Sequence, residues 1–123
     1  MAVEISEASP ESEPGFRTVH EIRLNGKYVG FVDVGYLRKE DVKTFQKYAK
    51  RKLRAGQAFG VQLFIDVSKS GVTTKQIGLA GLREIVQAVK TKFGGLEDRD
   101  IYVLEVVAGN KKPLGRGEVL TIT

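Results

Sequence analysis

The sequence predicts an α/β sandwich of the α+β type, a two-layer fold in which two helices cover one face of a mixed sheet. Three observations lead to this prediction. The chain of 123 residues is long enough for one domain with two packed layers. Short apolar segments with two-residue periodicity alternate with two longer segments in which apolar residues recur every three or four positions. Short polar links join these segments, so the expected element order is β-β-α-β-α-β-β.

Residues 1–15 are predicted to be a disordered acidic tail, followed by a single domain at 16–123. The tail is rich in Glu, Ser and Pro, so the burial of its few apolar residues cannot offset the entropy lost on ordering. It contains four Glu and no Lys or Arg, whereas the net charge of the chain is +5, so the domain itself carries +9. The tail could compete weakly with a nucleic acid for the basic domain, although a solvating role is the simpler interpretation.

Residues 16–34 are predicted to form a β-hairpin, because RTVHEIRL and KYVGFVDV flank the turn sequence Asn25-Gly26. His20 is the one histidine of the chain and shares a strand face with Thr18 and Ile22. A single histidine in a chain without cysteine is more often structural than a metal ligand or a general base.

Residues 36–56 are predicted to form an amphipathic helix with a buried face and a cationic face. Four apolar residues at helical spacing define the buried face: Val42, Phe45, Ala49 and Leu53. A neighbouring arc carries the cations Lys39, Lys43, Lys47, Lys50 and Arg54. Cations without acids at i+3 or i+4 repel one another, and an anion bound there would relieve that repulsion. We therefore expect a surface for a polyanion, the alternative being a solvated helix face.

Residues 58–67 are predicted to form a central strand, because alternate positions are apolar along its whole length. The turn DVSKSGVTTK follows and contains Lys69. Its backbone amides and hydroxyls could hold a phosphate at the start of the second helix. Ordinary N-capping by Thr73 or Thr74 accounts for the same residues, and both interpretations are open.

The second helix, expected at 74–93, has an apolar arc too broad for one contact. One half of the arc contains Ile77, Gly81, Ile85 and Ala88, and the other contains Leu79, Leu82, Val86, Val89 and Phe93. The first half can cover the sheet, whereas the second needs another partner, either the first helix or another subunit. The sequence therefore favours a homodimer or heterodimer through Leu82, Val86, Val89 and Phe93.

Two last strands are expected at 101–108 and 118–123, joined by GNKKPLGRG at 109–117. The three glycines of this link predict mobility, and its cations Lys111, Lys112 and Arg116 suit an arm that follows a phosphate backbone. A simple polar hairpin loop is the alternative.

Composition argues against several classes of function. The chain has no cysteine, and Asp33, Asp66 and Glu105 fall on different strands without a recurring pair for acid–base catalysis. We therefore expect no enzymatic activity, no cofactor and no metal. No apolar run approaches the ~20 residues of a membrane span, and the acidic N-terminus is unlike a secretory signal. An intracellular location, in the cytoplasm, nucleoid or nucleus, is expected.

From about Tyr28 to the C-terminus the chain resembles the Alba family of chromatin and RNA-binding proteins. The resemblance is carried by VDVG, DVSKSG, REIVQAVKTKF, EVVAGNKK and EVLTIT, in that order. It implies a dimer without catalytic activity that binds DNA or RNA largely without sequence preference. It also implies binding roles for Arg38 and Lys39, for Lys69, and for Lys111, Lys112 and Arg116. The extra strand at 16–24, and YLRKED in place of the family's lysine-lysine-proline, depart from the family pattern.

The sequence thus predicts a non-enzymatic protein that binds nucleic acid through phosphate contacts as a dimer. The same element order occurs in the C-terminal domain of translation initiation factor three, so both RNA and DNA are open as ligands. The residues expected to make the contacts are Arg38, Lys39, Lys43, Lys47, Lys50, Lys69, Lys111, Lys112 and Arg116. The alternative is an assembly or heterodimer subunit of a ribonucleoprotein or other complex, with little nucleic-acid affinity of its own.

Overall fold

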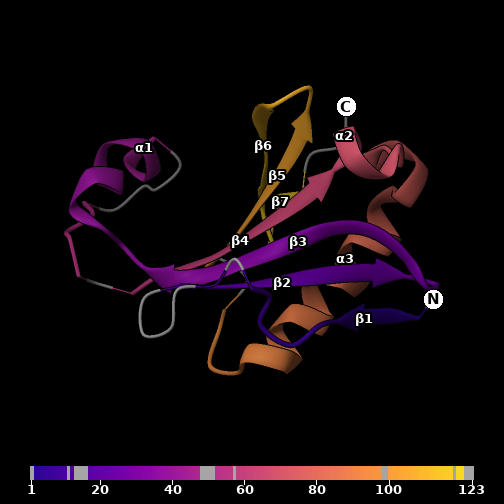
Figure 1. Cartoon of the computed structure of the whole chain (residues 1–123), viewed down its shortest axis with the longest axis horizontal. Helices are drawn as coiled ribbons and strands as arrows, with labels where there is room; N and C mark the ends of the chain where they lie inside the picture. The colour runs from indigo at the N-terminus through magenta and orange to yellow at the C-terminus, as the bar shows by residue number, and fades with distance from the viewer. Residues whose placement is uncertain are drawn as a thin grey trace.

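The computed structural model describes residues 2–10, 12, 17–47, 52–56, 58–97, 100–117 and 119–120. Within these residues, seven strands form one sheet in which each strand lies beside its neighbours in the sequence (Figure 1). The strands are β1 (Val3–Ile5), β2 (Arg17–Leu24), β3 (Lys27–Tyr36), β4 (Ala58–Asp66), β5 (Ile101–Val107), β6 (Asn110–Arg116) and β7 (Val119–Leu120). The helices are η1 (Lys39–Asp41), α1 (Val42–Gln46), α2 (Val67–Ser70) and α3 (Thr74–Phe93).

The sheet is mixed, as the sequence predicts. β4 and β5 are parallel, with Leu63 paired with Val103, and the other neighbouring strands are antiparallel. The β2–β3 hairpin turns at Asn25 and Gly26, whose φ angles of 52° and 80° suit an Asn-Gly turn. The predicted α+β class and the predicted hairpin are therefore confirmed.

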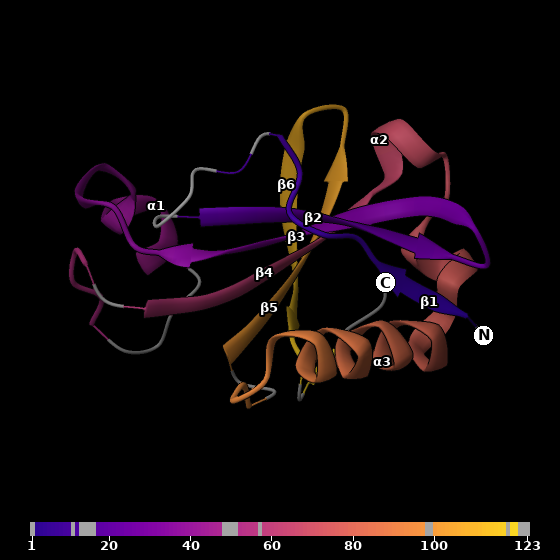
Figure 2. The same ribbon diagram turned by 60° about the horizontal axis from the view of Figure 1, so that its bottom comes forward.

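Helix α3 covers one face of the sheet and forms the main core with it (Figure 2). Leu82, Ile85 and Val89 are fully buried against strand residues such as Val61 and Leu63. The helix begins with a capping box, in which the Thr73 hydroxyl accepts from the Gln76 amide and the Gln76 side chain accepts from the Thr73 amide. This bears out the capping interpretation of the turn. Among the described residues, no helix is both long and apolar enough to cross a membrane.

The predicted helix at 36–56 is wrong in length and in position. Its described helical part is the short η1 and α1, which lie beyond one end of the sheet instead of on the face covered by α3 (Figures 1 and 2). The reason is topological. β3 and β4 pair antiparallel, so the chain between them turns back at the end of the sheet and never crosses its face. Ala49 and Lys50 lie outside the described residues.

The dimer surface predicted on the second helix is also wrong. Leu82, Val86 and Val89 are at most 4% exposed within their own chain, and the ring of Phe93 packs at 4.8 Å against His20. β1 packs on the helix as well, because Val3 and Ile5 lie against the α3 core on the side of Ala88. The half of the arc with Leu82, Val86 and Val89 is therefore buried within its own chain.

Residues 2–10, predicted to be part of a disordered tail, are ordered in the structure. β1 pairs antiparallel with β2, with Ile5 opposite Ile22, and the amide of Ser9 donates to the carbonyl of Val19 at 2.7 Å. Composition alone predicts that nothing offsets the entropy lost when this segment becomes ordered. In the structure, the pairing of β1 with β2 and the packing of Val3 and Ile5 offset that loss. Residues 11 and 13–16 lie outside the described part of the chain.

Candidate nucleic-acid interface

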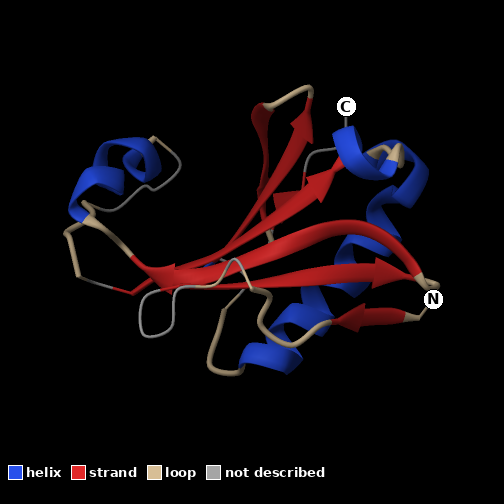
Figure 3. Ribbon diagram, viewed as in Figure 1, coloured by secondary structure: helices blue, strands red, loops and turns tan. Residues whose placement is uncertain are grey.

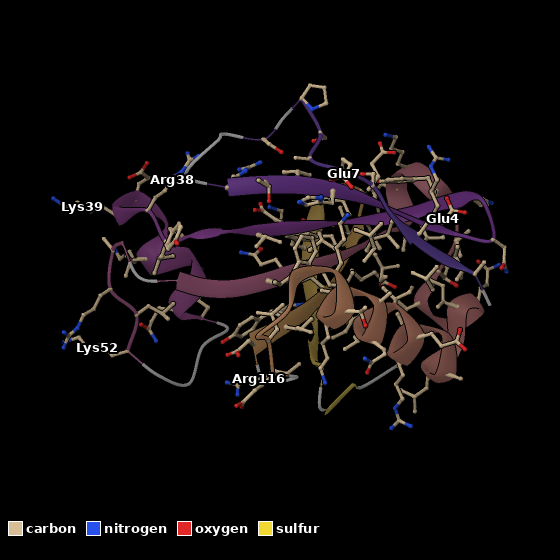
Figure 4. All side chains as sticks on the ribbon, turned by 90° about the horizontal axis from the view of Figure 1, so that it is seen from below. Glu4, Glu7, Arg38, Lys39, Lys52 and Arg116 are labelled. Atoms are coloured by element: carbon tan, nitrogen blue, oxygen red, sulfur yellow. The ribbon has the colours of Figure 1, made fainter. Side chains whose placement is uncertain are left out.

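The link between β3 and β4, residues 37–56, is rich in positive charge, and its described cations lie at one end of the molecule. We call it the basic loop. It holds eight of the 20 Lys and Arg of the chain and two acids, Glu40 and Asp41. Lys39, Lys43, Lys47, Lys52 and Arg54 are exposed. Figure 4 shows Arg38, Lys39 and Lys52 at one end of the molecule, with Glu4 and Glu7 toward the other.

Two leucines hold the basic loop against the sheet. Leu37 and Leu53 are 1% and 3% exposed and belong to an apolar cluster with Phe64, Tyr102 and Leu104. The amide of Leu53 donates to Oε1 of Gln46 at 2.9 Å. Where the loop begins and ends, the amide of Gly56 donates to the carbonyl of Leu37 at 2.7 Å. The predicted burial of Leu53 is confirmed, and its cationic neighbours are carried on an anchored segment.

Aromatic residues and cations meet on the sheet face opposite α3. Phe31 and Phe64 are paired on β3 and β4, and their rings stack at 4.6 Å between centroids. Nζ of Lys111 lies 5.2 Å from the centroid of the Phe64 ring, and Cζ of Arg116 lies 5.6 Å from that of Tyr102. These distances are within the range of cation–π attraction, so both cations are oriented along this face by the rings beneath them.

A hollow of about 310 Å³ lies between the basic loop and the β5–β6 hairpin. Its lining includes Lys47 from the end of α1 and Arg116 from β6, two cations that are far apart in the sequence. The apolar part of the lining includes Tyr102, Leu104 and Pro113. The structure therefore brings two of the predicted binding residues together at one concave site.

The predicted mobile arm at 109–117 is wrong for most of its length. Residues 110–116 form β6, paired along β5, and Ala108 and Gly109 form the turn with positive φ angles of 49° and 80°. The ring contacts place Lys111 and Arg116 on the face opposite α3. The two cations are five positions apart, and they share this face because a β-bulge between Pro113 and Gly115 shifts the alternation by one residue. Lys112, paired with Glu105, belongs to the other side of the strand.

Lys69 is remote from the basic loop. α2 and α1 lie at opposite ends of the sheet (Figure 1). Lys69 Nζ lies 4.6 Å from the ring centroid of Tyr28, whose hydroxyl donates to Asp66 at 2.8 Å. Ser68 ties α2 to the β5–β6 turn, because its Oγ accepts from the Ala108 amide at 2.6 Å. Lys69 therefore lies near the turn between β5 and β6, and it does not line the hollow.

Sequence reasoning missed Tyr102 and Pro113 as part of a site. Tyr102 has the pattern of a core strand residue, and Pro113 lies in the segment predicted to be a loop. Alternation along 110–116 does not place Arg116 beside Tyr102, because that contact depends on the β-bulge between Pro113 and Gly115. The approach of Lys47 also has no sequence signal, because it depends on the loop conformation. Among the described residues, no three His, Asp or Glu side chains are grouped to hold a metal ion.

Comparison with known protein families and with curated proteins finds no match for the sequence, and comparison with solved structures finds none for the fold. The resemblance to the Alba family therefore stays a prediction, and so do the functions it implies.

Proposed function

We propose that the protein binds nucleic acid, without catalysing a reaction, by contacting phosphates with the basic loop and the neighbouring cations of β6. The observation that carries the proposal is the segregation of charge. The loop alone has eight cations against two acids, more excess positive charge than the whole chain, whose net charge is +5. Neighbouring like charges repel one another, and a polyanion that follows the surface relieves the repulsion and releases its own counterions.

The anchoring of the loop supports this proposal. Buried Leu37 and Leu53 anchor the described parts of the loop, so less loop entropy is lost when a ligand binds to the cations beside them. Lys111 and Arg116 extend the positive surface along β6. Because phosphates are common to DNA and RNA, the proposal covers both, and because the α3 core is internal, it requires no dimer.

The proposal is tested by exchanging cations at two places on the surface. The loop variant Lys39→Ala, Lys43→Ala, Lys47→Ala and the control Lys27→Ala, Lys75→Ala, Arg83→Ala each remove three exposed positive charges. Anisotropy titrations with labelled duplex DNA and single-stranded RNA are made at several salt concentrations. The loop variant should bind more weakly and lower the slope of log affinity against log salt by about two to three, since each lost phosphate contact removes close to one unit.

The control variant should keep most of the affinity and the slope of the parent. Equal losses in the two variants would mean that net charge alone attracts the nucleic acid, and the basic loop would then not be the interface. If the parent chain binds no DNA or RNA at low salt, the proposal fails. The alternative of an assembly subunit would then be the one to pursue.

A further inference from the structure

The geometry of the hollow between the basic loop and the β5–β6 hairpin points to a site for one unpaired nucleotide, so that the protein prefers single-stranded nucleic acid to a duplex. This inference rests on the proposed function and deepens it, because phosphate contacts alone do not distinguish a single strand from a duplex.

The lining of the hollow combines two chemistries. Lys47 and Arg116 offer positive charge, whereas Leu104, Pro113 and Tyr102 offer apolar surface. A site that held phosphate alone would gain nothing from an apolar lining. A nucleotide has both a phosphate and an apolar base face, and the volume of about 310 Å³ is at the small end of ligand sites, which suits one such unit.

Arg116 is the group that a base would meet. Tyr102 is 7% exposed and the guanidinium of Arg116 lies over its ring, so the arginine covers the tyrosine and faces the hollow. Unstacked bases pack on the planes of arginine guanidinium groups as well as on aromatic rings. We therefore place the base against Arg116 and Pro113, with Tyr102 behind the guanidinium. Lys47 lies on the loop side, where it can contact the phosphate.

The preference for a single strand follows from whether a base can enter the hollow. In a duplex, both faces of every base are covered by neighbouring base pairs, and the phosphates lie outside. A duplex can therefore contact the exposed cations of the loop but cannot insert a base into the hollow without first unstacking it, which costs a few kcal/mol. A single strand can insert a base at much lower cost.

The first test separates charge from shape at Arg116. The variant Arg116→Lys keeps the positive charge but removes the planar group that stacks on a base. Affinity for a thymidylate oligomer of about 12 nucleotides should fall about tenfold, the scale of one lost base stack. Affinity for a duplex of the same length should fall much less, because the lysine keeps the charge for the phosphate contact proposed at this position, and both salt slopes should be kept. An equal change for the two ligands, or no change for either, would overturn the inference.

The second test fills the hollow without changing charge. Pro113 is exposed on β6, and Pro113→Leu puts a longer apolar side chain without a ring into the site, so that it fills the space and offers no new stacking surface. The matched control is Ala80→Leu on the exposed side of α3. Pro113→Leu should weaken single-strand binding about tenfold, the scale of one lost base stack, and leave duplex binding unchanged, whereas the control should change neither. Circular dichroism checks the fold of both variants.

The outcomes separate this inference from the proposal on which it rests. If the parent binds neither single strands nor duplexes, the proposed function is wrong. If the parent binds both equally, and Arg116→Lys binds both as the parent does, phosphate binding stands and the nucleotide site is wrong.

Discussion

The two helical regions α1 and α3 were expected to lie on the same face of the sheet, and they behave in opposite ways. α3 spans 20 residues with a kink at Gly78 (φ 78°, ψ 164°), it begins with a capping box, and it buries Leu82, Ile85 and Val89. α1 has five residues and follows directly on η1, whose N-cap Arg38 makes no side-chain capping hydrogen bond, and it lies beyond the sheet. Figure 3 shows how far apart the two lie. Both segments have helical periodicity, so periodicity alone does not place a helix on a sheet.

Strand direction explains the difference. β4 and β5 are parallel, so the chain must return across the sheet, and α3 packs on the face that it crosses. β3 and β4 are antiparallel, so the basic loop needs no crossover and projects from the end of the sheet. The first arrangement places the core under α3, and the second leaves the cations of the loop on the surface. The following predictions test this division between a stabilising helix and a loop that is dispensable for the fold.

The largest effect is expected for Leu82→Ala in α3. Leu82 is fully buried in the core, so its removal leaves a cavity and should lower the free energy of unfolding by about 3 kcal/mol. The control is Leu79→Ala on the same helix, where the side chain is 38% exposed. Its loss in the free energy of unfolding should be well under half of the loss for Leu82→Ala. Urea denaturation measures both. Similar losses for the two leucines would contradict the assignment of the core face.

A smaller loss is expected when the basic loop is removed. Residues 38–55 are replaced by Asn-Gly, keeping Leu37 and Gly56, so that β3 and β4 are joined as a hairpin. The domain should still fold cooperatively, with the loss of about 2 kcal/mol that the burial of Leu53 contributes. Thermal unfolding followed by circular dichroism tests this. Complete loss of cooperative unfolding would show that the loop is part of the core.

The capping box of α3 gives a third prediction. Thr73→Ala removes the hydroxyl that accepts from the Gln76 amide and should lower the free energy of unfolding by about 1 kcal/mol. Thr73→Ser keeps the acceptor and should be nearly neutral. Urea titrations of the two variants make the comparison, and equal stabilities would mean that the cap is not formed.

The smallest effect is expected at the N-terminal contact with α3. Nζ of Lys92 lies 2.9 Å from Glu7, and this ammonium group lowers the pKa of the Glu7 carboxyl below its ordinary value of 4.5. Because the folded-state pKa is lowered, the contact stabilises fully above about pH 4.5 and is lost as pH falls through the lowered pKa. Glu7→Gln should therefore destabilise slightly at neutral pH and not at all in acid. The effect is small because Glu7 is 92% exposed and solvent screens the pair. Stability curves against pH that stay parallel would refute the contact.

Several elements follow from the sequence by itself, because their causes are local. The Asn25-Gly26 turn, the alternation of Val61, Leu63 and Ile65, and the Thr73 cap of the second helix each depend on a few neighbouring residues. The clustering of cations at 37–56 is also read directly from the sequence, since charge does not depend on conformation. The local pattern therefore determines where the main helix and most strands lie, and which loop is basic.

Tertiary structure decided what these elements meet. Val3 and Ile5 join the sheet because β2 offers an edge and α3 an uncovered flank, which a composition averaged over 15 residues cannot show. Lys47 and Arg116 line one hollow because β3 and β4 run antiparallel and the chain between them folds back beside β5 and β6. Strand direction depends on pairings between distant segments, whose energies come from the whole sheet at once. For this reason, the sequence indicates each of the proposed binding residues only as a separate cation. The fold brings two of them, Lys47 and Arg116, together in one hollow.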